Sequence, residues 1–196
     1  MYKTLNRLVL VNSKVSFSSE SIFGNIFAEP KRNQYREKRL VGYSQEKVYS
    51  VVNAVHLYKN FVPFCTGSDK LQVLPNGTRV YKLTVGFPPL VESYVSNVTS
   101  TRPDFIKSVA IETNIFKFLV NEWKFTPGPE ENKDSCYIDF NVDFIFKSVV
   151  YSHLANFYFD KVVSVMVDAF LKEIRRRHGP ESIEARKPQI LSYIKE

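Results

Sequence analysis

Residues 135–179 constrain the fold more than any other stretch of the sequence. From Cys136 to Phe146 apolar side chains occupy every second position, which predicts a strand that covers a core with one face. After Ser148, a suitable N-cap, the apolar spacing changes to three and four, and Gly179 ends the pattern. The sequence therefore predicts a strand followed by a helix of about thirty residues, roughly 45 Å long.

The helical part carries a single apolar stripe. Its members are Leu154, Tyr158, Val162, Val165, Met166, Ala169 and Phe170. Four positive or titratable side chains fill the last turn, namely Arg175, Arg176, Arg177 and His178. Positive charge there interacts favourably with the helix dipole. A helix this long must lie across a whole sheet.

Six further strands are predicted upstream, because turn residues such as Pro75-Asn76-Gly77 separate alternating segments. The seven strands are expected at 34–43, 64–74, 78–86, 90–101, 104–113, 116–126 and 136–147. Two short helices are expected between Ser44 and Asn60. Consecutive strands without crossover helices pair as antiparallel neighbours. We predict an α+β helix-grip fold, in which a curved seven-stranded antiparallel sheet wraps on the long C-terminal helix.

Composition limits the kinds of protein to which this chain can belong. With 196 residues, 44% of them hydrophobic, the chain can form one domain with a substantial core. No run of about eighteen apolar residues predicts a membrane span. The net charge of +7 suits anionic lipid and nucleic acid equally. Cys65 and Cys136 form no CxxC pattern, so we expect two buried thiols and no metal site.

The two ends differ in composition from the predicted domain. Residues 1–19 are basic, rich in Ser and Thr, and contain no acidic residue, which is typical of a mitochondrial presequence or of an ordinary disordered N-terminus. We expect a presequence and linker at 1–33, the folded domain at 34–179 and a tail at 180–196. The tail could form a loose helix on the domain or on a membrane, with Ile183, Ile190, Leu191 and Ile194.

A helix-grip fold commonly leaves a cavity between sheet and helix, and large apolar residues are the candidates to line it. The strands contribute Tyr81, Leu83, Val85, Leu119, Trp123, Phe125, Phe140, Val142 and Phe144. The helix contributes Tyr158, Val162, Met166 and Phe170. A solid core is the alternative, because aromatic stripes serve packing more often than ligand binding.

Two motifs carry a family resemblance. The run from Leu83 to Tyr94, LTVGFPPLVESY, and the run from Leu119 to Phe125, LVNEWKF, resemble the mitochondrial coenzyme Q-binding proteins of the START-like (polyketide cyclase/dehydrase and lipid transport) superfamily. Shorter matching pieces are Arg39-Leu40-Val41, Val62-Pro63-Phe64-Cys65 and Phe159-Asp160. The resemblance covers about 35–178, essentially the whole predicted domain.

The resemblance implies a non-enzymatic lipid binder with no catalytic residues, metal or cofactor. Such a protein holds ubiquinone, or another polyprenyl quinone, in its cavity and acts as a chaperone for respiratory electron transport and quinone biosynthesis. It implies a peripheral location at the matrix side of the mitochondrial inner membrane. The implied partners are ubiquinone, the membrane surface and enzymes of quinone biosynthesis, and nucleic acid is not among them.

A quinone ring needs polar partners, and a membrane carrier needs a contact surface. The candidate partners of a ring carbonyl are Tyr81, Tyr94, Tyr158, Asn121 and Cys136. The candidate membrane-insertion or gate loop is Phe87, Pro88, Pro89 and Leu90, although its apolar side chains could instead tuck under the sheet edge. Lys172 and the arginines of the last helical turn could contact anionic headgroups or simply cap the helix.

Two other function classes remain open from the residues. A START-like cyclase or hydrolase acting on an aromatic substrate would need a carboxylate or histidine inside the cavity. His56, His153 and His178 form no recognisable pair, and Asp139 and Asp143 fall on the polar face of their strand. A nucleic-acid binder would expose aromatic and basic residues together, whereas here the aromatic residues point inward.

Overall fold

The computed structural model describes residues 29–87, 90–148 and 165–195. Its strands are β1 (Arg32–Val41), β2 (Cys65–Val73), β3 (Arg79–Phe87), β4 (Leu90–Thr101), β5 (Phe105–Thr113), β6 (Phe116–Pro127), β7 (Cys136–Phe146) and β8 (Gln189–Lys195). Two short helices follow β1, namely α2 (Gln45–Val52) and the 3-10 helix η1 (Val55–Asn60). A C-terminal helix occupies residues 165–178.

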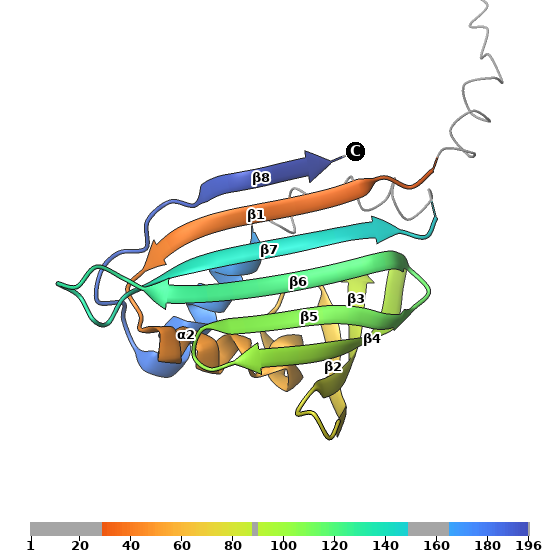
Figure 1. The fold of residues 1–196 in the computed structure, drawn as a ribbon, viewed down its shortest axis with the longest axis horizontal. Helices are drawn as coiled ribbons and strands as arrows, with labels where there is room; N and C mark the ends of the chain where they lie inside the picture. The colour runs from red at the N-terminus through yellow and green to blue at the C-terminus, as the bar shows by residue number, and fades with distance from the viewer. Residues whose placement is uncertain (1–28, 88–89, 149–164, 196) are drawn as a thin grey trace, which may run out of the picture.

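The strands form one antiparallel sheet in the order β2-β3-β4-β5-β6-β7-β1-β8 (Figure 1). The C-terminal helix and the two short helices lie behind this sheet in the view of Figure 1, so the sheet has one covered face. The predicted α+β fold class is confirmed, and each predicted strand occurs with boundaries shifted by only a few residues. The expected strand count is corrected, because the described residues form a sheet of eight strands and not seven.

The additional strand comes from the tail. β8 pairs antiparallel with β1, with Asn33 opposite Lys195 and Gln34 opposite Ile194. A loose helix over this segment is therefore wrong. The physical reason is that β1 would otherwise be an edge strand with unpaired backbone groups, and the Ile- and Tyr-containing β8 suits a strand that satisfies them.

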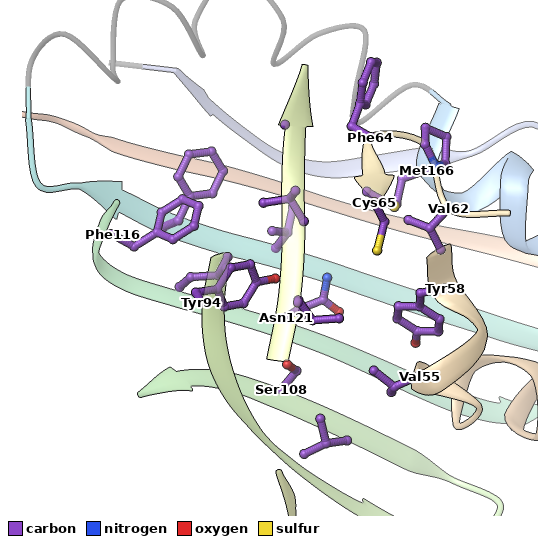
Figure 2. Close-up of a pocket in the computed structure, with 18 of the residues that line it drawn as sticks. Val55, Tyr58, Val62, Phe64, Cys65, Tyr94, Ser108, Phe116, Asn121 and Met166 are labelled. Atoms are coloured by element: carbon purple, nitrogen blue, oxygen red, sulfur yellow. The ribbon is translucent and has the colours of Figure 1, made fainter. Parts of the chain in front are cut away.

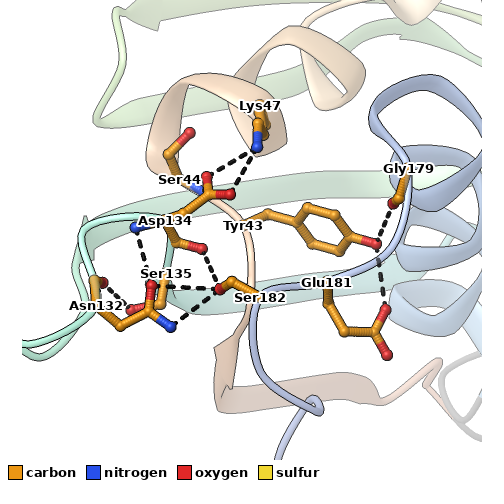
Figure 3. Close-up of polar contacts among 9 residues, drawn as sticks. All are labelled: Tyr43, Ser44, Lys47, Asn132, Asp134, Ser135, Gly179, Glu181 and Ser182. Atoms are coloured by element: carbon orange, nitrogen blue, oxygen red, sulfur yellow. Dashed lines mark hydrogen bonds and ion pairs between the residues drawn. The ribbon is translucent and has the colours of Figure 1, made fainter.

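Hydrogen bonds hold the segment between the C-terminal helix and β8 against the rest of the domain (Figure 3). Gly179 has φ 82° and its N–H bonds to the Arg175 carbonyl at 2.9 Å, as expected for a left-handed cap. The Tyr43 hydroxyl donates to the Gly179 carbonyl at 3.0 Å. Ser182 then donates its N–H to the Gly42 carbonyl at 2.8 Å. These contacts fix the tail against the end of β1 and set the register of β8.

Gly42 is required by this close approach. A Cβ at this position would lie 2.3 Å from the Ile183 carbonyl oxygen, which is too short for any real contact. The tail can therefore pass directly over the end of β1 only because residue 42 has no side chain.

Ion pairs cover the outer face of the sheet between β1 and β7. Arg32 binds Asp143 through two hydrogen bonds of 2.8 and 2.5 Å, and Arg36 binds Asp139 through two of 2.9 and 2.6 Å. Both carboxylates thus lie on the polar face, where the strand pattern predicted them. They point away from the core and can take no part in chemistry on its side of the sheet.

The core lies between the inner sheet face and the C-terminal helix. Val167, Phe170 and Ile174 are at most 2% exposed and form the buried stripe of this helix. Trp123 on β6 contacts Phe170, with ring centroids 4.7 Å apart. The earlier part of the predicted helix, with Tyr158 and Val162, falls outside the described residues, so the thirty-residue helix stays a prediction.

Other expectations concern the cysteines and the chain ends. Cys65 and Cys136 are free and buried, as predicted. The predicted presequence at 1–33 falls almost entirely outside the described residues, and β1 begins at Arg32, slightly before the predicted domain start. No helix within the part of the chain that the structure describes is both long and apolar enough to cross a bilayer.

Candidate functional site

A cavity of about 300 Å³ lies on the inner side of the sheet. Strands β3 to β7 form one wall, and η1, the turn that follows it, Cys65 at the start of β2 and the C-terminal helix contribute the rest (Figure 2). The wall is mostly apolar because the inward positions of these strands carry Leu, Val, Phe and Trp. The fold therefore encloses space that can hold an apolar or aromatic ligand.

Nine of the thirteen candidate lining residues lie in the wall of this cavity. They are Leu83, Val85, Leu119, Trp123, Phe140, Val142, Phe144, Met166 and Phe170. Tyr158 and Val162 fall outside the described residues. That the lining residues bind a ligand remains a prediction.

Tyr81 and Phe125 do not reach the cavity, although both were placed among its candidates. They are 2% and 1% exposed and belong to the solid core. Tyr49 on α2 packs edge-on against Phe125, with ring centroids 6.5 Å apart. Near α2 the inner sheet face is filled by the short helix, so inward-facing residues there pack and do not line open space.

Further cavity residues come from elements for which the sequence predicted no lining role. η1 and its turn contribute Val55, Tyr58 and Val62, while β5 contributes Ile106 and Ser108. The alternation of β5 could have indicated the second pair, because positions 106 and 108 share the inward face. A six-residue 3-10 helix has too few turns to define a face from its sequence.

Two polar side chains face the cavity without a partner among the described residues. The Tyr94 hydroxyl on β4 points toward Asn121 on β6, and both line the cavity (Figure 2). Other polar lining groups are already bonded, since the Tyr58 hydroxyl donates to the Val52 carbonyl and Ser108 pairs with Ser96 at 2.6 Å. Burial raises the pKa of Tyr94 above its ordinary value, so this hydroxyl keeps its proton at neutral pH.

Of the five candidate partners for a ring carbonyl, the structure brings Tyr94 and Asn121 to the cavity. Tyr81 and Cys136 are buried away from it, and burial raises the pKa of the Cys136 thiol to about 12. Tyr158 lies outside the described residues.

Comparison with known proteins defines the family. The family model described as "Polyketide cyclase / dehydrase and lipid transport" matches residues 41–171. The chain belongs to this family. The resemblance to its coenzyme Q-binding members is also confirmed, since 157 residues are 45% identical to the "Coenzyme Q-binding protein COQ10, mitochondrial" of Drosophila melanogaster. That match covers 79% of this chain and 64% of the Drosophila protein, so it spans less than two thirds of the relative's length.

The chain is also similar to proteins with other names. The "Ribosome association toxin RatA" of Escherichia coli K12 is 33% identical over 141 residues, covering 70% of this chain and 84% of the toxin. Among solved structures, the Zhui aromatase/cyclase of a Streptomyces species matches with a TM-score of 0.64 at 15% identity, covering 75% of this chain and 96% of that one. The structural match shows the shared fold and nothing about activity.

Because the polyketide cyclase and lipid transport family includes cyclases, the chemistry of the cavity wall matters. Among the described lining residues there is no histidine, and Glu92 is the one carboxylate. His56 and His178 lie outside the lining, and His153 outside the described residues. The described wall therefore assembles no paired acid and base of the kind that general acid–base catalysis requires.

One backbone conformation in the cavity wall is unusual for a residue other than glycine. Phe64, in the turn between η1 and β2, has φ 63°, which a residue with a Cβ adopts only at a cost of roughly 1–2 kcal/mol. Its carbonyl accepts a hydrogen bond from the Gly86 N–H at 2.9 Å. Tertiary contacts thus hold this turn in place and tie it to the end of β3, where both residues line the cavity.

The predicted gate loop forms the tip of the β3–β4 hairpin, in which the Phe87 backbone pairs with Leu90. Gly86 and Glu92, on the two arms of this hairpin, line the cavity. The hairpin tip therefore lies beside the cavity. Pro88 and Pro89 fall outside the described residues, so a gating or membrane role of the loop stays a prediction.

Proposed function

We propose that this chain binds coenzyme Q, or a closely related polyprenyl quinone, in the cavity between sheet and helix and acts as a lipid chaperone. The observation that carries the proposal is a mostly apolar cavity in a chain 45% identical to a protein named for coenzyme Q binding. A polyprenyl quinone is almost insoluble in water, so its transfer or storage requires an apolar enclosure with a few polar groups for the ring.

The volume supports a particular mode of binding. At roughly 20–30 Å³ per non-hydrogen atom, scaled from the ~30 Å³ that liquid water occupies per molecule, about 10–15 such atoms fill a cavity of about 300 Å³. A substituted quinone ring has this size, whereas each isoprene unit adds five carbons. The ring and the start of the tail fit, and most of a long tail extends beyond the described cavity.

The cellular setting is part of the proposal. We infer a peripheral location on the matrix side of the mitochondrial inner membrane, reached through a presequence in residues 1–33. The word mitochondrial in the relatives' names and the basic, acid-poor composition of residues 1–19 support it. There the protein would supply quinone for respiratory electron transport and for enzymes of quinone biosynthesis.

Binding without catalysis is the role that the cavity wall favours. The described lining offers one carboxylate, no histidine and two neutral polar groups without partners. These groups can hold an oxygenated ring but do not form an acid–base pair. A cyclase or hydrolase acting on an aromatic substrate is the alternative, and it would require a paired acid and base in the cavity.

The test is direct extraction of purified protein. A sample beginning near residue 30 is extracted with organic solvent, and the extract is examined by mass spectrometry and by its ultraviolet change on borohydride reduction. A near-stoichiometric polyprenyl quinone is expected. Well-folded protein that yields no quinone and takes up none from solution would contradict the proposal.

A further inference from the structure

A row of polar side chains crosses three neighbouring strands on the inner face of the sheet. Ser96 on β4 and Ser108 on β5 share a hydrogen bond of 2.6 Å, and Asn121 on β6 lies opposite Ser108 in the strand register. Ser96 is completely buried. The row therefore begins in the core and ends at the cavity wall, at Asn121.

Apolar residues surround the end of this row. Along β6, Leu119 and Trp123 flank Asn121 on the same inward face, and across the sheet Val142 on β7 lies opposite it. An amide in such surroundings offers two donors and an acceptor that the described protein does not satisfy. Leaving these groups without partners costs free energy, so the position is explained best by a ligand or water that reaches it through the cavity.

Tyr94 on β4 is the second polar residue that faces the cavity near Asn121. Its hydroxyl points toward Asn121 in Figure 2, and its ring packs edge-on against Phe116 with centroids 5.8 Å apart. Packing orients the ring while the hydroxyl stays free to bond in the cavity. A tyrosine hydroxyl and an asparagine amide can each donate and accept a hydrogen bond.

We propose that Tyr94 and Asn121 form a neutral hydrogen-bonding subsite for the oxygenated ring of the ligand, and that this subsite binds the quinone and the quinol with similar affinity. The inference rests on the proposed function. It adds the orientation of the bound ligand and the redox forms in which the ligand can bind. A quinone carbonyl only accepts hydrogen bonds, whereas a quinol hydroxyl also donates. Because both side chains can serve either role, neither oxidation state leaves them without a partner.

The chain contains its own reporter of binding. Trp123 is the only tryptophan, it lines the cavity and it is adjacent to Asn121 on the inner face of β6. A quinone ring at the subsite lies close enough to quench its fluorescence. The first two probes are ubiquinone with two isoprene units and the quinol made from it by borohydride. The third is squalene, an isoprenoid hydrocarbon without oxygen, and its binding is measured by its competition with the quinone.

The variants are Tyr94→Phe and Asn121→Leu, which remove the polar groups and keep the side-chain size. Each is expected to weaken quinone and quinol binding about tenfold, near the upper range for one hydrogen bond, and to leave squalene binding within about twofold. Ligand-free Asn121→Leu is expected to melt at a higher temperature than the wild type, because a polar group without a partner among the described residues has been replaced by an apolar one. A purely structural role of Asn121 would predict the opposite shift.

Tyr49→Phe is the matched control, because Tyr49 is a buried tyrosine outside the cavity lining whose hydroxyl bonds to Ser100 at 3.0 Å. It is expected to leave all three affinities unchanged. In the wild type, quinone and quinol affinities are expected to differ by less than tenfold, which for a two-electron couple is a shift of under about 30 mV.

The outcomes separate this subsite from the proposed function. Quinone binding of wild-type strength in both variants would overturn the subsite and leave the quinone carrier standing. Equal losses for quinone and squalene would also overturn it, because the substitutions would then have damaged packing. Absence of quinone binding in the wild type would overturn the carrier function and the subsite together.

Discussion

Arg39 on β1 donates a hydrogen bond to Asp168 on the C-terminal helix at 2.6 Å, and so joins the sheet to the helix that covers it. Arg39 also pairs with Glu37 at 3.1 Å, and the Tyr35 hydroxyl donates to the same carboxylate. Glu37 is 1% exposed. A buried carboxylate thus depends on two neighbours, and the arginine is the only positive charge among them.

Replacing Arg39 by Met should destabilise the fold by about 3–5 kcal/mol, because Glu37 would remain buried without its positive partner. Replacing Asp168 by Asn should cost only about 0–1 kcal/mol, since the Asp168 side chain is 51% exposed. Urea unfolding followed by circular dichroism measures both. Similar losses in the two variants would show that the helix contact, and not the buried carboxylate, sets the cost.

Glu173 provides a prediction about pH. It is 7% exposed, and hydrogen bonds from Arg176 and Arg177 lower its pKa from 4.5 to about 2. A carboxylate whose pKa is lower in the folded state stabilises the protein above its unfolded pKa, and this contribution disappears as the pH falls from 4.5 to 2. The contribution has an upper bound of roughly 3–4 kcal/mol, at 1.36 kcal/mol per pKa unit.

Glu173→Gln should therefore be less stable than the wild type at pH 7 and should approach it near pH 2. The measurement is the free energy of unfolding of both proteins at a series of pH values between 2 and 7. Salt should reduce the difference, because Arg176 is 71% exposed. Parallel curves for the two proteins across this range would refute the assignment.

Trp123 tests the packing of the cavity wall. It is 3% exposed and its ring centroid lies 4.5 Å from that of Phe140. Trp123→Ala should cost about 3–5 kcal/mol, through lost burial and an enlarged cavity. Leu71→Ala is the control, because Leu71 is 53% exposed and its loss should cost less than about 0.5 kcal/mol. A Trp123→Ala protein that is fully stable and still retains ligand would remove this residue from the ligand-binding set.

Local periodicity was enough to predict most of the sheet. In β7, alternation alone assigns Phe140, Val142 and Phe144 to one face, and all three line the cavity. The pattern cannot tell lining from solid core, because that depends on what covers each position. Tyr81 and Val85 share the inward face of β3, yet only Val85 reaches the cavity, while Tyr81 packs in a core that includes α2 and η1 residues.

Long-range partners explain the features that sequence reasoning missed. β8 is a strand because β1 has a free edge beside it, and the hydrogen bond from Ser182 to Gly42 sets its path. Neither fact is visible in the tail itself. Likewise, Asn121 and Tyr94 were only two of five polar candidates, and which of the five reach the cavity depends on what covers each inward position. Spacing along one strand carries no information about that cover.

The β3–β4 hairpin tip is a candidate for membrane contact, and Val91 beside it is 46% exposed. Phe87→Ser with Leu90→Ser should weaken association with liposomes containing anionic lipid by about tenfold or more, since burying each large apolar side chain contributes roughly 1.5–3 kcal/mol. Leu71→Ser with Val73→Ser on β2 is the control, because both side chains are 53% exposed but lie away from this hairpin tip. Flotation assays compare the two double variants, with circular dichroism as a check of folding. If both double variants bind liposomes as the wild type does, the hairpin tip is not the membrane contact. If both double variants lose binding equally, association is a general property of exposed apolar surface and the loop has no special role.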